Sequence, residues 1–374
     1  MVEKYEFEKN YRNQLYKGTT YIIPGNPSFG YNFGFAIYIP ATTEEVTNVL
    51  MYSPNTGGAG INEEGKLDSK TPAFHLKDGI EAIKQKCIGF NHGKMLSHNL
   101  NMPVITPLVP RIVGYYTQSM GSYVFHNDTS YLKFSNSERN CEENKLTDEE
   151  IKEIELYCYN IFEQVASGLP NVLDFIRSMG YEVDDKVIVG GYSAGSKFAN
   201  YFTAIHPECV KAAFGGGIGG LMIIPQDSIE VEGKQISLKY PLGTSDIKHF
   251  DKEAFDNIPQ YYYMGDVDFN DPAESIVIDG KLMPLYGDCY TPEEIELINK
   301  YLGAKGPERF WNVTSYYSEG ALFRQFPGDH NSICSANENG ICISDESVCE
   351  FVRNVLENEK IKCKWKILRI KSFK

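Results

Sequence analysis

The fold is decided by one stretch of sequence, Lys186-Val187-Ile188-Val189-Gly190-Gly191-Tyr192-Ser193-Ala194-Gly195. Its first five residues predict a short buried strand, and Ser196–Ile205, which follows, has helical spacing. Ser193 stands on the turn between them, and the glycines at 191 and 195 let neighbouring backbone approach closely. A Gly-x-Ser-x-Gly match arises by chance with a probability on the order of 0.2 in a chain of ordinary composition. The strand, tight turn and helix around the motif therefore make Ser193 a candidate nucleophile.

Segments with strand and helix character alternate outward from this stretch. Strands are expected at Phe35–Ile39, Val46–Tyr52, Met102–Pro107, Val210–Phe214, Ile258–Met264 and within 310–326, and helices at Ala73–Cys87, Thr147–Ser178 and Ser344–Glu357. The long helical stretch begins with a capping box of Thr147 and Glu150 and stops at Gly180. Gly168 and Pro170 predict a kink in it. The alternation predicts an α/β fold, with a mostly parallel central sheet flanked by helices on both faces.

A single domain over residues 1–374 is the simplest account of the organisation, because the sequence has no internal repeat and no linker rich in Pro, Gly or Ser. Three stretches interrupt the alternation within a core of about 35–358 and are expected as insertions at loop positions, namely 114–146, 221–257 and 272–306. Cations alternate with apolar residues in 359–374. This pattern favours an edge strand guarded by lysines, with a basic docking tail for an acidic partner as the alternative.

The composition excludes several classes of protein. The chain is 42% hydrophobic and 13% aromatic, which suffices for a large core and argues against disorder. Its formal net charge is -14, from 50 acidic and 36 basic residues, which argues against a nucleic-acid partner. No stretch approaches the roughly 20 consecutive apolar residues of a membrane span.

The predicted location is cytoplasmic. The N-terminal stretch Met1–Glu6 has neither the basic start nor the apolar run of a signal peptide. The nine cysteines are scattered, with no Cys-x-x-Cys pair and no zinc-ligand spacing, which favours reduced thiols. The alternative is an exported protein whose leader is absent from this sequence, with a Cys334–Cys342 bridge closing a small loop.

A serine nucleophile needs a histidine base, and chain order restricts the choice. In hydrolases with this strand–turn–helix element the serine comes first, the acid next and the histidine last. Three of the seven histidines follow the serine: His206, His249 and His330. His206 lies about one helix beyond the serine, and His249 precedes the best acid candidates. His330 stands in a turn after the last expected strand and is therefore the predicted base.

The acid is expected on the turn after the strand Tyr261–Gly265, where both Asp266 and Asp268 fit. The same acidic run matches a calcium loop at its first, third and fifth positions. Its sixth and twelfth positions, however, carry Asp271 and Val277, where glycine and glutamate are required. A calcium site is therefore not expected, and the choice between the two aspartates stays open on the spacing alone.

The expected oxyanion hole consists of two backbone N–H donors. One is expected from Ala194, immediately after Ser193. The other is expected from the loop after the second strand, where Gly57-Gly58 permits close approach of backbone. Thr56 is the predicted donor there, with Asn55 as the alternative.

These segments resemble the α/β-hydrolase superfamily, and within it the bacterial polyhydroxyalkanoate-depolymerase-like and feruloyl-esterase-like branch. The resemblance spans most of residues 35–335 and is carried by Tyr38–Pro40, Met51–Gly58, Met102–Arg111, Val189–Pro207, Met264–Pro272 and Phe326–His330. It implies the α/β-hydrolase fold. It also implies an acid three residues after the glycine that closes its strand, which selects Asp268 over Asp266. The usual His-Gly pair before the hole residue is Pro54-Asn55 here, so the hole residue is assigned by its spacing from the glycine pair.

The resulting hypothesis is a serine hydrolase that cleaves a carboxylic ester, small or polymeric, through an acyl-enzyme on Ser193. His330 would accept the serine proton while Asp268 orients the imidazole, and no metal or organic cofactor is needed. The alternatives are a peptidase of the prolyl-oligopeptidase kind, an acyltransferase, and a hydrolase fold retained as a binding module.

Overall fold

The computed structural model describes residues 1–43, 47–53, 60–62, 64–68, 73, 75–110, 147–219, 222–269, 276–278, 281–283, 290–335 and 342–357. The chain divides into two compact units, unit 1 (Met1–Phe198) and unit 2 (Ala199–Lys374), and each is described by itself. The predicted insertion at 114–146 and the predicted C-terminal strand or tail at 359–374 lie outside the described residues.

Unit 1 combines an antiparallel edge with parallel strands. Its strands are β1 (Glu3–Tyr11), β2 (Gln14–Ile23), β3 (Phe35–Pro40), β4 (Leu50–Ser53), β7 (Val104–Pro107) and β8 (Val187–Tyr192), with β5 (Gly60–Ile61) and β6 (Leu67–Asp68) as a separate short pair. The strand order is β1-β2-β3-β7-β4-β8. Neighbours from β1 to β7 are antiparallel, whereas β4 pairs in parallel with both β7 and β8. The hairpin β1–β2 extends the predicted core, which begins at about residue 35.

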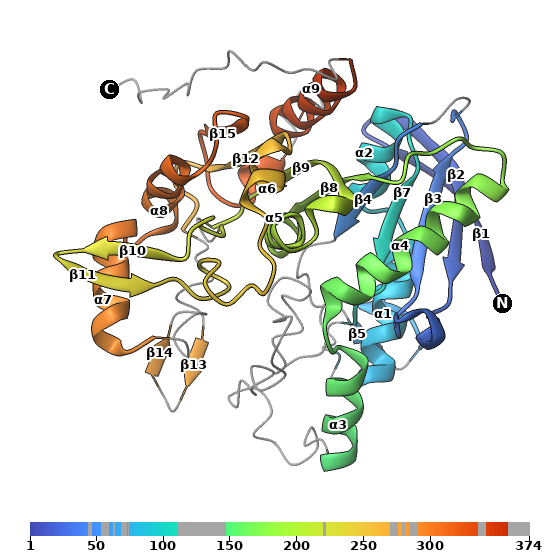
Figure 1. Ribbon diagram of the computed structural model, residues 1–374. Helices are drawn as coiled ribbons and strands as arrows, with labels where there is room; N and C mark the ends of the chain where they lie inside the picture. Colours follow the sequence, from blue (N-terminus) through green and yellow to red (C-terminus); the bar gives the residue numbers. More distant parts are fainter. Residues whose placement is uncertain are drawn as a thin grey trace. The chain divides into compact units, whose positions relative to one another are not determined.

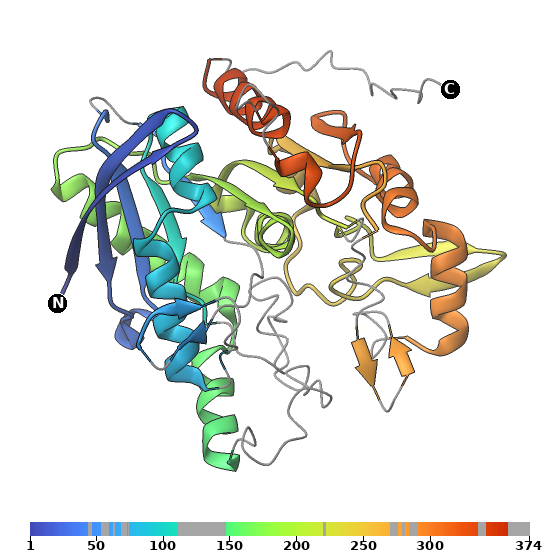
Figure 2. The same ribbon diagram turned by 180° about the vertical axis from the view of Figure 1, so that it is seen from behind.

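Helices cover both faces of the strands of unit 1. These are α1 (Leu76–Ile88), α2 (His92–Leu100), α3 (Asp148–Tyr157) and α4 (Ile161–Ser178), and α5 (Ala194–Ile205) follows β8. Side chains alternate along a strand, so Tyr21 points to one face, where its ring contacts Phe175 of α4 at 5.5 Å. Its neighbour Ile22 points to the other face and clusters with Ile83 of α1. Figures 1 and 2 show α4 on one face and α1 and α2 on the opposite face.

The long helical stretch is two helices rather than one kinked helix. The predicted capping box at Thr147 is present at the start of α3. The break comes after α3, where Asn160 adopts a left-handed φ of 46° at the start of α4. The break was expected near Gly168 and Pro170, but α4 continues through both. Gly168 is needed for packing instead, because an added Cβ would lie 2.6 Å from Cζ of Phe35.

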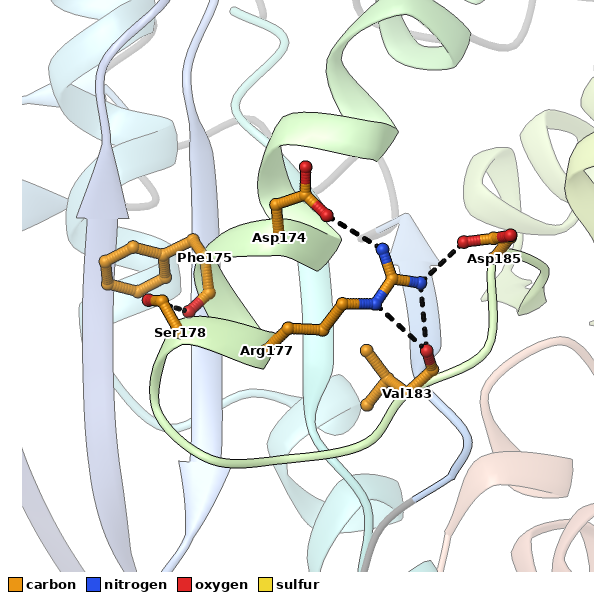
Figure 3. A network of polar contacts seen from close by, with 6 residues as sticks. All are labelled: Asp174, Phe175, Arg177, Ser178, Val183 and Asp185. Atoms are coloured by element: carbon orange, nitrogen blue, oxygen red, sulfur yellow. Dashed lines mark hydrogen bonds and ion pairs between the residues drawn. The ribbon is translucent and has the colours of Figure 1, made fainter.

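The connection from α4 to β8 is held by one arginine (Figure 3). Arg177 donates from Nε and Nη2 to the carbonyl of Val183, at 3.2 and 2.9 Å. Its Nη1 and Nη2 also contact the carboxylates of Asp174, at 2.8 Å, and Asp185, at 2.6 Å. The predicted helix stop is confirmed, since Gly180 has a φ of +96° directly after the helix. These contacts fix the entry of β8, the strand that carries Ser193 at its end.

Lys94 of α2 is a buried cation, only 1% exposed. Its Nζ donates to Thr20 Oγ1 at 2.8 Å and to the carbonyl of Ile88 at 2.7 Å. The same nitrogen lies 4.1 Å from the ring centre of Phe7 and 4.9 Å from that of Tyr38. Burial in these surroundings lowers the pKa of Lys94 to about 7, from an ordinary value of 10.5.

Lys94→Met should flatten the dependence of stability on pH. Between pH 7 and pH 10 the unfolded chain binds a proton on Lys94 that the folded protein has released. The free energy of unfolding of the wild type therefore rises with pH there, by up to about 1.4 kcal/mol per pH unit. Urea denaturation at about pH 7.5 and 9.5 measures this rise. The control is Lys84→Met, because Lys84 lies at the surface 2.8 Å from Glu3. Equal slopes in the wild type and Lys94→Met would contradict the prediction.

Unit 2 is built around three parallel strands. Its strands are β9 (Val210–Gly216), β10 (Ser228–Val231), β11 (Lys234–Ser237), β12 (Gln260–Gly265), β13 (Ile276–Ile278), β14 (Lys281–Met283) and β15 (Ala321–Phe326). Its helices are α6 (Lys252–Asn257), α7 (Pro292–Leu302), α8 (Gly306–Val313) and α9 (Ile343–Glu357). β12 lies between β9 and β15 and pairs in parallel with both. The predicted insertion 221–257 carries the hairpin β10–β11 and α6, and 272–306 carries the hairpin β13–β14 and α7.

Strand β12 is buried on both faces. The ring of Tyr261 contacts Phe351 of α9 at 5.5 Å, and its hydroxyl lies 2.5 Å from Ser347 Oγ of the same helix. The next residue, Tyr262, points to the opposite face, where Asn200 Nδ2 of α5 donates to its hydroxyl at 3.0 Å. These contacts fix the strand that ends at the predicted acid turn.

The predicted α/β class is confirmed. Parallel strands alternate with helices, and the strands of each unit are covered on both faces. No helix among the described residues is long and apolar enough to cross a lipid bilayer. Cys342, within the described part of unit 2, is a free buried thiol whose Sγ lies 3.6 Å from the carbonyl of Ile333. The Cys334–Cys342 bridge considered above is therefore not formed.

Candidate functional site

Ser193 lies on a strained turn between β8 and α5. Its φ is 56°, in the left-handed region that costs a residue with a Cβ about 1–2 kcal/mol. The serine is partly exposed, whereas the neighbouring residues on both sides, Tyr192 and Ala194, are buried. Its carbonyl accepts hydrogen bonds from the Ser196 N–H at 3.0 Å and from Ser196 Oγ at 2.5 Å. The turn therefore exposes the side chain of Ser193 at the start of a helix.

The glycines of the motif permit this turn. An added Cβ on Gly191 would lie 2.7 Å from the Cα of Gly195, so a side chain at position 191 would collide with backbone. The helix begins at Ala194, and the backbone N–H groups of a first helical turn favour negative charge in front of them. The chain thus forms the strand, the tight turn and the helix that the sequence predicts around Ser193.

Unit 2 brings Asp268 and His330 together. Asp268 stands on the turn after β12, and His330 on the turn after the neighbouring parallel strand β15. Asp268 Oδ2 lies 2.9 Å from His330 Nδ1. The side chain of Asp268 is fully buried and that of His330 is 15% exposed. Because a carboxylate only accepts, Nδ1 carries the hydrogen and Nε2 is the nitrogen that can accept a proton.

The two turns are also joined through backbone. The N–H of Asp266 donates to the carbonyl of Phe326 at 2.8 Å, and the N–H of Val267 donates to the carbonyl of Gly328 at 3.2 Å. Gly265 lies so close to Gly328 that an added Cβ would overlap its carbonyl oxygen and lie 2.9 Å from its carbonyl carbon. The Asp268–His330 contact therefore depends on a close approach that only glycine at position 265 permits.

The turn that carries His330 is closed by its own side chains. The Asp329 carboxylate accepts from the N–H groups of Asn331, at 3.0 Å, and Ser332, at 2.8 Å. In return the N–H of Asp329 donates to Ser332 Oγ at 2.7 Å. The hydrogen bonds from Ser332 and Asn331 hold the pKa of Asp329 below its ordinary value. The backbone on both sides of His330 is thus fixed.

Gly265→Ala should disrupt the contact between Asp268 and His330 without removing either residue. The new methyl group must push the Gly328 carbonyl away, which displaces the turn that carries His330. A displacement of about 1 Å in a catalytic group costs on the order of 10²-fold in turnover. Steady-state hydrolysis of an aryl ester measures the loss. The control is Gly320→Ala, where the added Cβ meets no atom closer than 3.7 Å. Equal activity of the two variants would contradict the prediction.

Of the remaining predicted site residues, the structure describes one, Ala194, and does not describe the other two. Ala194 is the first residue of α5, directly after Ser193. Thr56 and Asn55, the two candidates for the second oxyanion donor, lie outside the described residues. Sequence reasoning missed the roles of Gly265 and Gly328 in bringing the turns together. The signal in the sequence is their position, since Gly265 closes β12 three residues before Asp268 and Gly328 lies two residues before His330.

Comparisons with known proteins give structural likeness only. No known protein-family profile and no curated protein sequence matches the chain. Poly(aspartic acid) hydrolase-1 from Sphingomonas sp. KT-1 is similar in structure, with a TM-score of 0.44 and 14% identity over 94% of this chain and 98% of that one. An S-formylglutathione hydrolase from Agrobacterium tumefaciens has a TM-score of 0.43 and 12% identity, over 94% and 99% of the two chains. LpqC, a poly(3-hydroxybutyrate) depolymerase from Bordetella parapertussis, has a TM-score of 0.39 and 11% identity, over 96% and 90%.

Proposed function

We propose that the protein is a serine hydrolase that cleaves a carboxylic ester through an acyl-enzyme on Ser193. The observation that carries the proposal is the 2.9 Å contact between His330 Nδ1 and the buried carboxylate of Asp268. A histidine oriented in this way, which can accept a proton on Nε2, is the base that an uncharged serine needs for attack. The strained turn that exposes Ser193 supplies the nucleophile.

The proposed reaction has two steps. His330 Nε2 accepts the proton of Ser193 as Oγ attacks the ester carbonyl, and it returns that proton to the alcohol that leaves. In the second step His330 removes a proton from water, which attacks the acyl-enzyme and releases the acid. Asp268 holds the imidazole and stabilises its cationic form throughout.

The negative oxygen formed in both steps needs donors placed in advance. We assign one to the N–H of Ala194, because it follows the nucleophile and begins α5. The second is assigned to the N–H of Thr56, as the sequence predicts. Each such donor contributes about 10²–10³ in turnover. No metal or organic cofactor enters either step.

Labelling with a fluorophosphonate tests the proposal, because the reagent forms a covalent bond only with an activated serine. The folded protein should take up one label per chain, and mass spectrometry should locate it on the peptide that contains Ser193. Heat-denatured protein is the control and should remain unlabelled. A folded protein that takes up no label would favour the alternative in which the fold is retained as a binding module.

A substrate series then separates the enzyme classes. Aryl esters of increasing acyl length should be hydrolysed, and peptide amides should be cleaved far more slowly. Faster cleavage of the amides would instead assign a peptidase. Transfer of the acyl group to an added alcohol in preference to water would assign an acyltransferase.

A further inference from the structure

We infer that Asp266 is a positioning residue, whose carboxylate holds the turn that carries His330 in register with Asp268. The inference rests on the proposed function, because it assigns a role within the same site. It also separates the two aspartates that spacing alone leaves equivalent, since each contacts a different part of the histidine turn.

The two carboxylates make different contacts. Asp266 Oδ1 accepts a hydrogen bond from the backbone N–H of Gly328 at 2.8 Å. Asp268 Oδ2, two residues later, contacts the imidazole of His330. Because the chain turns at Asp266 and Val267 after β12, the two side chains have different surroundings: Asp268 is fully buried whereas Asp266 is exposed. Asp266 therefore contacts the backbone of the turn, and Asp268 contacts the ring.

The hydrogen bond to Asp266 fixes Gly328, and the shape of the turn that carries His330 depends on this glycine. Gly328 has a φ of +125°, a conformation that residues with a Cβ rarely adopt. Its N–H is bound by Asp266, and its carbonyl accepts from the N–H of Val267 at 3.2 Å. Gly328 lies two residues before His330. Its N–H and its carbonyl both bind the turn after β12. Without the carboxylate, the glycine N–H would lose its partner and this conformation would be less restricted.

The hydrogen bond needs an acceptor rather than a charge. Asparagine at position 266 keeps a carbonyl oxygen at the place of Oδ1, and its amide nitrogen can face solvent because the side chain is exposed. A catalytic acid behaves in the opposite way, because an amide beside the imidazole favours the wrong tautomer. Asn and Ala substitutions therefore distinguish positioning from catalysis.

The test compares Asp266→Ala, Asp266→Asn and a matched control in steady-state hydrolysis of an aryl ester. Asp266→Ala should lower kcat about 10- to 100-fold with KM within about threefold, because the histidine is misplaced rather than lost. Asp266→Asn should restore kcat to within about threefold of wild type, with an unchanged pH profile of kcat/KM. The control is Asp251→Ala, which removes an equivalent bond, from Ala254 N–H to Asp251 Oδ1 at 2.9 Å, away from the histidine turn. Its kcat should match that of wild type even where its stability falls.

Hydrogen exchange of the Gly328 amide gives a readout that does not depend on activity. Exchange should become faster in Asp266→Ala and stay slow in Asp266→Asn. Wild-type activity in Asp266→Ala, or a loss in Asp266→Asn as large as in the alanine variant, would overturn the inference. A wild-type protein with no hydrolysis and no fluorophosphonate label would overturn the proposed function instead, and the exchange measurement would still decide whether Asp266 holds the turn.

Discussion

Replacing Ser193 with alanine is expected to lower kcat on an ester by about 10⁶-fold and to abolish fluorophosphonate labelling. Removal of the nucleophile in serine hydrolases costs about this much, because the histidine and the aspartate act only through the attacking oxygen. The variant should fold, since alanine removes one oxygen from a partly exposed side chain. Circular dichroism and urea denaturation check the fold, and single-substrate kinetics check the loss. Retention of more than about a hundredth of the wild-type kcat would contradict the assignment of Ser193.

Ser193→Gly tests the strain of the same turn. Glycine adopts a φ of 56° without the penalty that serine or alanine incurs, although it also gives the unfolded chain more freedom. The net expectation is a free energy of unfolding about 0.5–1 kcal/mol higher than that of Ser193→Ala, with no activity in either variant. The control pair is Ser178→Gly and Ser178→Ala, at the last residue of α4, where glycine should be the less stable. A Ser193→Gly variant no more stable than Ser193→Ala would show that the turn is unstrained.

The regions that could be predicted from the sequence are those where periodicity, turn chemistry and chain order agree. The strand before Ser193 and the helix after it are readable from an apolar run, two glycines and helical spacing. The contact between Asp268 and His330 follows from one topological rule, that neighbouring parallel strands end at the same edge of a sheet. Each of these patterns lies within a short segment of sequence. The rule on parallel strands then places the ends of two such segments side by side.

The N-terminal hairpin could not be predicted because its usual signals are missing. The turn between β1 and β2 has positive φ at Arg12 (51°) and Asn13 (60°), where Asn-Gly or Asp-Gly is typical. β1 itself is mostly exposed, so its sequence lacks the run of buried apolar residues that marks the other strands. Similarly, the break at Asn160 needs a left-handed residue that is not glycine, whereas Pro170, the expected site of a break, lies inside α4. Both cases depend on left-handed residues other than glycine, which the sequence does not mark.

The distinction between Asp266 and Asp268 shows where spacing alone reaches its limit. Both follow the same strand, and the turn at Asp266 and Val267 gives their side chains different surroundings. Which of the two faces the histidine depends on how closely Gly265 and Gly328 approach, a contact between segments about sixty residues apart. Burial then follows from that approach, since Asp268 is enclosed and Asp266 is not.

Asp268→Asn is expected to lower kcat about 10⁴-fold while leaving the fold intact. Asparagine has nearly the same volume, but its amide nitrogen donates toward Nδ1 of His330. The ring then accepts at Nδ1 and carries its hydrogen on Nε2, so it cannot take the proton of the serine. Hydrolysis of an aryl ester across pH 6 to 9, with denaturation curves in parallel, measures the effect.

The matched control for that variant is Asp227→Asn in the same unit. Asp227 Oδ1 accepts from Thr244 Oγ1 at 2.9 Å, a bond that an amide oxygen can keep, so activity should equal that of wild type. Comparing the kcat of Asp268→Asn with that of Asp266→Asn then shows which aspartate is the acid that orients His330. If Asp268→Asn keeps more than about a tenth of the wild-type kcat while Asp266→Asn loses about 10⁴-fold, the roles of the two aspartates are reversed. The buried contact between Asp268 and Nδ1 makes the opposite result the expected one, because this carboxylate touches the imidazole ring whereas that of Asp266 binds the backbone N–H of Gly328.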